Sequence, residues 1–216
     1  MKIDVVSDVS CPWCAVGLHA LEEALARFDP PLPVELHFQP FELNPQMAPE
    51  GQDIEEHLSQ KYGLNAAQLA SNREALRQRG AAVGFTFTSG ARSRIYNTFD
   101  AHRLLHWADL EGGGRQAALK HALLKAYFTD GENPSDHGVL LRLAGAVGLD
   151  TARAQAILAG DEYAAEVRER EQWYLQRGIH SVPAVIIDDR HLISGGQPPD
   201  VFEQALRRLA GAPADA

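Results

Sequence analysis

The chain is poor in cysteine and has fewer basic than acidic residues. Two cysteines occur among 216 residues, which excludes a small secreted scaffold built on disulfides. Lysine and arginine number 20 against 29 acidic residues, a formal net charge of −9 that disfavours nucleic-acid and anionic-membrane partners. No apolar run approaches the roughly 20 residues of a membrane span, and residues 1–8 lack a signal-peptide pattern. We therefore expect a cytoplasmic protein with no nucleic-acid or membrane partner.

The two ends of the chain carry strand patterns. Residues 3–7 form a short apolar run, Pro12 suits the first position of a helix, and residues 34–38 alternate apolar and polar side chains. This order predicts a βαβ unit. Near the other end, residues 184–187 and 191–194 flank a turn and predict a hairpin, followed by a helix from about Pro199.

The middle of the chain has helical spacing of apolar residues and no fixed-period repeat. We expect an α/β protein in which residues 1–48 and 179–212 form one domain and residues 49–178 form an inserted all-helical domain. The segment 211–216 is predicted to be a disordered tail. The predicted helices of the insertion cover residues 52–62, 66–82, 96–110, 115–127, 136–147, 151–158 and 161–177.

The only two cysteines stand three positions apart in the segment Cys11-Pro12-Trp13-Cys14, where the first strand gives way to a helix. Free N–H groups at a helix N-terminus favour negative charge, so this position favours the reactive thiolate of Cys11. Cys14, one turn further on, is placed to resolve a mixed disulfide. Plain buried cysteines and chance spacing are the alternatives, and a zinc site would need two further ligands. The spacing and the helix start favour redox use.

A proline precedes the late apolar strand in Ser181-Val182-Pro183. Proline removes a donor from the sheet ladder, so its presence there needs a reason. A cis Val182–Pro183 bond beside the cysteines leaves the N–H and C=O of Val182 free to pair with an extended substrate. A trans proline at the first residue of the strand is the alternative.

Together these features resemble a thioredoxin fold, and the long helical insertion resembles the DsbA family, most closely its FrnE-type branch of dithiol–disulfide oxidoreductases. The resemblance implies a cis Val182–Pro183 bond, with Cys11 as nucleophile and Cys14 as resolving thiol. Trp13 departs from DsbA, which carries histidine there, so the added positive charge expected of a very strong oxidant is missing. The matching segments are Asp8 to Cys14, Asn97-Thr98, Ala101 to Leu104, Ala126 to Thr129, Ser181 to Pro183 and Ser194 to Pro198.

Other candidate residues carry weaker signals. The resemblance implies that Asn97 and His102 line the substrate cleft, with helix capping and a polar helix face as the equal alternative. Trp13 is expected to be exposed beside Cys14, where it can contact substrates. His102 and His106 lie one helical turn apart, but no third ligand and no His-Glu-x-x-His pattern accompanies them, so no metal site is predicted.

The favoured function is thiol–disulfide exchange through Cys11 and Cys14, with protein or small-thiol substrates and no bound organic cofactor. Glutathione or a thioredoxin system is the candidate redox partner. The runner-up is a glutathione-dependent isomerase or transferase similar to 2-hydroxychromene-2-carboxylate isomerases and kappa-class glutathione transferases. Those enzymes typically place serine at the position of Cys11, which speaks against this interpretation. A chaperone or redox-sensing binding module is the third alternative.

Overall fold

The protein, a computed structural model that describes residues 1–48 and 50–211, is an α/β structure. The predicted α/β class with a helical insertion is confirmed, while the predicted tail lies outside the described residues except for Gly211. The strands are β1 Lys2–Ser7, β2 Glu35–Pro40, β3 Gln52–Asp53, β4 Arg94–Ile95, β5 Ala184–Ile187 and β6 His191–Ser194. The helices are α1 Pro12–Ala26, α2 Ile54–Tyr62, α3 Ala66–Ala82, α4 Phe99–Glu111, α5 Arg115–Phe128, α6 His137–Ala146, α7 Thr151–Ala159, α8 Ala164–Gln176 and α9 Pro199–Ala210.

The main sheet has the strand order β2-β1-β5-β6. Strands β1 and β2 run parallel because α1 returns the chain between them, as the βαβ pattern predicts. Strand β5 pairs antiparallel with β1, placing Val5 opposite Val185, and β6 continues as the predicted hairpin. The first strand therefore ends in the middle of the sheet, directly before the cysteine pair.

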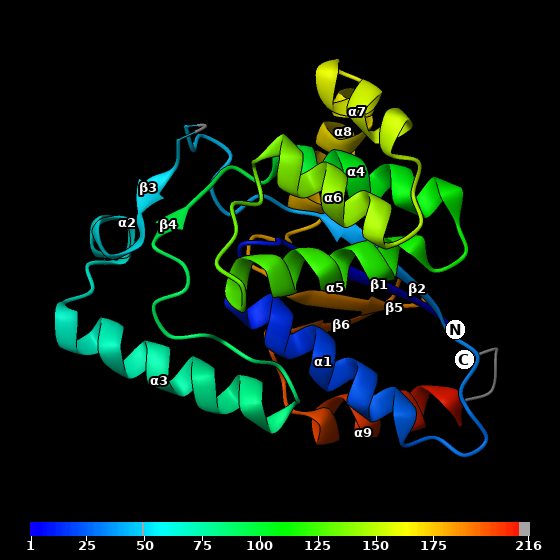
Figure 1. The fold of residues 1–216 in the computed structure, drawn as a ribbon. Helices are drawn as coiled ribbons and strands as arrows, with labels where there is room; N and C mark the ends of the chain where they lie inside the picture. Colours follow the sequence, from blue (N-terminus) through cyan, green and yellow to red (C-terminus); the bar gives the residue numbers. More distant parts are fainter. Residues whose placement is uncertain (49, 212–216) are drawn as a thin grey trace.

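Helices cover both faces of this sheet (Figure 1). Ile3 and Val5 point to the face covered by α1 and α9, where Leu18 and Phe202 complete a fully buried core. Val6 points to the other face and packs against Tyr174 of α8. The alternation along β1 follows from the two-residue period of a strand, and it buries almost the whole strand.

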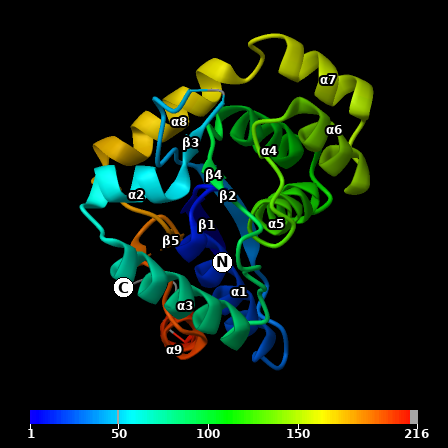
Figure 2. The same ribbon diagram turned by 60° about the vertical axis from the view of Figure 1, so that its left-hand side comes forward.

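The elements β3 to α8 lie between β2 and β5 in the sequence. Helices α4 to α7 build their own apolar core, but α5 also packs Leu124 and Phe128 into the core of the sheet. Figure 2 shows α3 next to α1, away from the group α4 to α7. Among the residues that the structure describes, no helix combines the length and apolarity needed to cross a membrane.

Three predicted helices of the insertion start two or three residues too early, among them the predicted helix 161–177, which begins at Ala164. The predicted helix 52–62 begins at Ile54, because residues 52–53 form β3 and Asp53 caps the helix by accepting from two backbone N–H groups. The predicted helix 96–110 begins at Phe99, because Ile95 pairs with Gln52 across the β3–β4 ladder. The ladder joins segments far apart in sequence. The predicted domain boundary at 178–179 falls in the connection between α8 and β5, whereas the boundary at 48–49 falls on residue 49, outside the described residues. Both boundaries stay predictions.

Candidate active site

Cys11 is the N-cap residue of α1. Its sulfur accepts a hydrogen bond from the backbone N–H of Cys14 at 3.3 Å, and Pro12 occupies the first helical turn, where a missing N–H leaves no partner unsatisfied. The carbonyl of Asp8 accepts from the Cys11 N–H at 3.3 Å and holds the turn. The positive end of the helix dipole and the hydrogen bond from the Cys14 N–H would both stabilise negative charge on the Cys11 sulfur.

Cys14 lies one turn into α1 and is 1% exposed, against 4% for Cys11. Both cysteines are free thiols. Burial and the neighbouring Cys11 sulfur raise the pKa of Cys14 well above its ordinary value. Cys14 therefore keeps its proton at pH values at which a thiol of ordinary pKa has ionised. Its sulfur lies beside Cys11, because residues three apart share a helix face.

The Val182–Pro183 loop faces the cysteine pair. Its peptide bond is cis, and the carbonyl of Val182 lies 3.7 Å from the Cys11 sulfur, which donates to it. Gly17 of α1 permits this approach, because a Cβ there would stand 3.0 Å from the Cγ of Pro183. The carbonyl of Pro183 accepts from the N–H of Gly195 at 2.8 Å, so the loop is fixed by the turn after β6.

Trp13 stands at the mouth of the site, 39% exposed. The guanidinium of Arg79 lies 5.8 Å from the centroid of its ring, and the same guanidinium donates to the carbonyl of Gly196 at 2.8 Å. Arg79 belongs to α3, so the insertion supplies a positive charge beside the cysteine pair. Arg79 was not among the predicted site residues, because nothing in the local sequence sets it apart from the other exposed arginines of α3.

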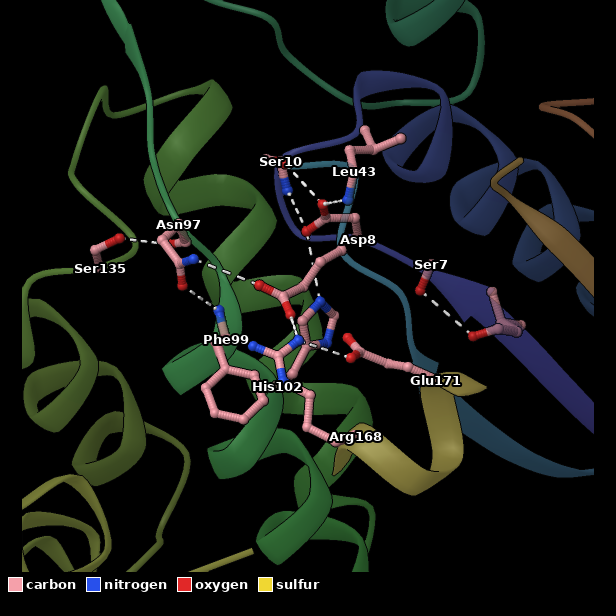
Figure 3. Close-up of polar contacts among 12 residues, drawn as sticks. Ser7, Asp8, Ser10, Leu43, Asn97, Phe99, His102, Ser135, Arg168 and Glu171 are labelled. Carbon is pink, nitrogen blue, oxygen red and sulfur yellow. Dashed lines mark hydrogen bonds and ion pairs between the residues drawn. The ribbon is translucent and has the colours of Figure 1, made fainter. Parts of the chain in front are cut away.

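Asp8 is buried beneath the turn that leads into α1. Its carboxylate accepts from the N–H and hydroxyl of Ser10 and from the N–H of Leu43, while Nε2 of His102 lies 3.5 Å away (Figure 3). Burial by itself raises the pKa of Asp8, but His102 and these backbone donors outweigh it and lower the pKa to about 2. Asp8 thus stays ionised in the interior and holds the turn that carries Cys11.

His102 lies inside the protein and not on the wall of a cleft. Its side chain is 2% exposed and faces Asp8, which does not fit the direct substrate contact that the resemblance implies. Arg168 and Glu171 of α8 lie beside it in Figure 3, and Arg168 also pairs with Glu42. Burial raises the pKa of Glu171. These groups extend the polar cluster from Asp8 to α8.

Lys120 of α5 is a buried charge that the sequence analysis missed. The residue is 1% exposed, and its Nζ has no hydrogen-bond partner within residues 1–48 and 50–211. Burial lowers its pKa, while negative charge on Cys14, Asp8 or Cys11 acts against this shift. A signal was present, because Lys120 lies three, four and seven positions before apolar residues of α5 and so shares their buried face.

Other predicted residues lie in different surroundings. Asn97 is half-buried, accepts from the N–H of Phe99 through Oδ1, and lines an open hollow of about 350 Å³ with Asp100 and His137. His106 packs 5.2 Å from the ring of Tyr163, whereas His102 faces Asp8. Asn97 thus lies in the turn before α4, whose N-cap is Thr98, and its place in the substrate cleft stays a prediction.

A helix that starts with Cys-Pro-Trp-Cys after the central strand, with a prolyl loop facing the first cysteine, defines a thioredoxin-fold dithiol protein. The chain belongs to the DSBA-like thioredoxin domain family, which matches residues 2–207. The DsbA-like family is a family of thiol–disulfide oxidoreductases, and the match covers both the sheet and the insertion.

Three known proteins illustrate the relationship. A probable DsbA oxidoreductase from Streptomyces coelicolor is 36% identical, and its crystal structure gives a TM-score of 0.91 over 100% of this chain and 92% of that chain. The uncharacterised protein YwbO of Bacillus subtilis (strain 168) is 30% identical over 207 residues, 95% of this chain and 96% of YwbO. The cytosolic disulfide reductase DsbM from Pseudomonas aeruginosa, solved with GSH, is 17% identical with a TM-score of 0.68 over 98% and 100% of the two chains. This third likeness shows the fold alone.

Proposed function

We propose that the protein exchanges disulfides with protein or small-thiol substrates, with Cys11 as the nucleophile and Cys14 as the resolving thiol. The observation that carries this proposal is the position of the Cys11 sulfur, which caps α1, accepts the N–H of Cys14 and faces the Val182 carbonyl. The raised pKa of Cys14 supports the division of roles, because a protonated thiol reacts more slowly than a thiolate.

The exchange proceeds in two balanced steps. The Cys11 thiolate attacks one sulfur of a substrate disulfide, the second substrate sulfur leaves as a thiolate and takes up a proton, and a mixed disulfide remains. Cys14 then loses its proton and attacks the Cys11 sulfur, which releases the first substrate sulfur as a thiol. Two electrons have passed from the dithiol to the substrate. The reverse sequence oxidises a substrate dithiol, so the redox partner sets the direction.

Lys120 supports the second step. Its ammonium group is buried and exerts an electrostatic effect on Cys14, so it lowers the free-energy cost of the Cys14 thiolate in a region where burial opposes any charge. Asp8 keeps the turn before Cys11 rigid through its three hydrogen bonds. Neither side chain contacts the substrate in this proposal; both act through the cysteines.

The substrate contacts are proposed from the surroundings of Cys11. Trp13 offers an exposed aromatic face, and Arg79 beside it favours an anionic partner. The backbone of Val182 is placed to pair with an extended chain, since its N–H makes no hydrogen bond to the described part of the protein. Glutathione carries both a thiol and carboxylates, and the DsbM structure with GSH makes it the first small thiol to test. The FrnE-type subtype and a cytoplasmic location stay predictions from the sequence.

Paired single substitutions test the proposal. Cys11→Ser should abolish the reduction of insulin and of a small disulfide reporter, because no other nucleophile replaces it. Cys14→Ser should retain the first step and accumulate mixed disulfides that mass spectrometry detects as the mass of protein plus substrate. Appreciable turnover by Cys11→Ser, or the absence of any adduct with Cys14→Ser, would contradict the assigned roles.

The same variants separate the alternatives from the sequence analysis. An isomerase that uses glutathione needs no resolving thiol, so its rate should survive Cys14→Ser. A chaperone or binding module should hold unfolded clients equally well when both cysteines are replaced by serine. A loss of disulfide turnover in each single variant, without isomerase activity in either, supports the oxidoreductase.

A further inference from the structure

Two histidines and a glutamate meet where α1 packs against α5. His19 and Glu22 are three positions apart and share one face of α1, and His121 reaches them from α5. One ligand atom from each of the three side chains lies within 4.8 Å of the other two. Figure 1 shows α5 running next to α1, and the 2.7 Å contact between Nε2 of His121 and Oε1 of Glu22 joins the two helices.

The hydrogen bonding of His19 leaves one ring nitrogen available as a ligand. Its Nδ1 lies 2.9 Å from the carbonyl of Ala15, and because a carbonyl only accepts, Nδ1 carries the proton. Nε2 of the neutral ring then holds a free lone pair. A backbone carbonyl that fixes the tautomer in this way is the usual partner of a metal-binding histidine.

The packing holds the His19 ring near its partners. Its centroid lies 4.9 Å from that of Phe85, and the ring of His121 stands perpendicular to it at 5.1 Å. Side chains of Glu22 and His121 are each 35% exposed, so water reaches the group and an ion has an entry path. Tetrahedral Zn²⁺ separates its ligand atoms by about 3.4 Å, which small side-chain rotations reach from the present spacing.

An ordinary histidine–carboxylate pair does not account for this group. His37 and Asp109 form such a pair at 3.1 Å, as do His137 and Asp100 at 2.8 Å. Within the described residues, neither pair belongs to a set of three potential ligands, whereas the pair of His121 and Glu22 has His19 beside it. The third donor is the feature that distinguishes the seam between α1 and α5.

We propose that His19, Glu22 and His121 form a binding site for a divalent transition-metal ion, with Zn²⁺ as the best match and water as the fourth ligand. Two imidazole nitrogens and one carboxylate suit Zn²⁺, Co²⁺ or Cu²⁺, whereas Ca²⁺ and Mg²⁺ require mostly oxygen ligands. On binding, the His121 proton moves from Nε2 to Nδ1, and the ion takes the lone pair that this exposes. The bound ion cross-links the helix that carries Cys11 and Cys14 to the helical insertion.

The sequence predicts no metal site, because these ligands lie far apart along the chain. Glu22 and His121 are 99 positions apart, and His19 and Glu22 alone make no metal motif. Only the packing of α5 against α1 brings the third ligand into place. The inference does not depend on the proposed redox function, because no atom of the cysteine pair takes part.

Metal binding is best measured in a full-length chain that carries Cys11→Ser and Cys14→Ser, since thiolates themselves bind these ions. Titration with ZnCl₂ followed by calorimetry should give one ion per chain. CoCl₂ should produce the visible absorption of a tetrahedral ion without a thiolate charge-transfer band. At about a hundredfold excess of Zn²⁺ over its Kd, the Tm should rise by roughly 5 °C or more.

Ligand variants in this background, compared with one matched control, identify the ligands. His19→Gln and His121→Gln should each weaken Zn²⁺ binding by at least about tenfold and remove the tetrahedral Co²⁺ spectrum. His37→Gln is the matched control, because it removes a histidine that pairs with one carboxylate, and it should bind like the parent. Circular dichroism checks that each variant is folded, and Glu22→Gln, which changes one oxygen only, serves if a histidine variant unfolds. Unchanged Zn²⁺ binding in the ligand variants, or no binding by the parent at millimolar ZnCl₂, would overturn the proposal.

Discussion

Asp8→Asn tests whether a buried carboxylate stabilises the turn before the cysteine pair. The pKa of Asp8 is lowered from 3.8 to about 2, which corresponds to about 2 kcal/mol of stability at neutral pH. Asparagine has the same shape but places an NH₂ group against the N–H of either Leu43 or Ser10, whichever way its amide is turned. Leaving such a buried donor without an acceptor costs about 1–3 kcal/mol. We therefore expect Asp8→Asn to lower the free energy of unfolding by about 2–4 kcal/mol at pH 7.

The dependence on pH identifies the ionic part of this loss. A carboxyl group whose folded pKa is depressed stabilises the fold above its unfolded pKa, and this contribution disappears as the pH falls through the folded pKa. Lowering the pH should therefore reduce the free energy of unfolding of the wild type more than that of Asp8→Asn. About 1 kcal/mol of the difference between them should be gone by pH 3.

Urea denaturation followed by circular dichroism at pH 7 and pH 3 measures both quantities. Asp150→Asn is the matched control, because Asp150 caps α7 from an exposed position, and asparagine caps a helix about as well as aspartate. Its effect should stay within about 0.5 kcal/mol. A loss below that value for Asp8→Asn at pH 7, or a loss that is the same at both pH values, would refute the reasoning.

Three further predictions follow from the packing around the site. At pH 7, iodoacetamide should modify Cys11 at least about tenfold faster than Cys14, because burial raises the pKa of Cys14. Equal rates in peptide mapping would contradict the assigned roles of the two cysteines. Gly17→Ala should lower the free energy of unfolding, measured in urea, by about 1–2 kcal/mol, because its methyl group would be too close to Pro183. An unchanged urea midpoint would show that the Val182–Pro183 loop moves aside without cost. Lys120→Met should raise the free energy of unfolding by about 1–3 kcal/mol at pH 7, because a buried ammonium group whose pKa is lowered destabilises the fold while it is charged. The same variant should slow the resolution of mixed disulfides. A variant less stable than the wild type would contradict this reasoning.

Local patterns were sufficient for most elements of the sheet. The predicted hairpin 184–187 and 191–194 matches β5 and β6 residue for residue, because apolar β-rich runs around a turn depend only on near neighbours. The predicted start of α1 at Pro12 is also correct, since proline and an N-cap act within one turn. The starts of α2 and α4 were missed because β3 and β4 pair across the insertion.

The amino-acid sequence by itself determined the cysteine spacing, the helix start that carries it and the alternation that buries β1 on both faces. Each of these follows from interactions within a few residues or from the period of a strand. Only the tertiary structure decided which distant side chains meet. It brought Lys120 within electrostatic reach of the cysteines, His102 to Asp8 and His121 to α1. The partners of a buried polar group depend on how whole helices pack, and no local pattern encodes that arrangement.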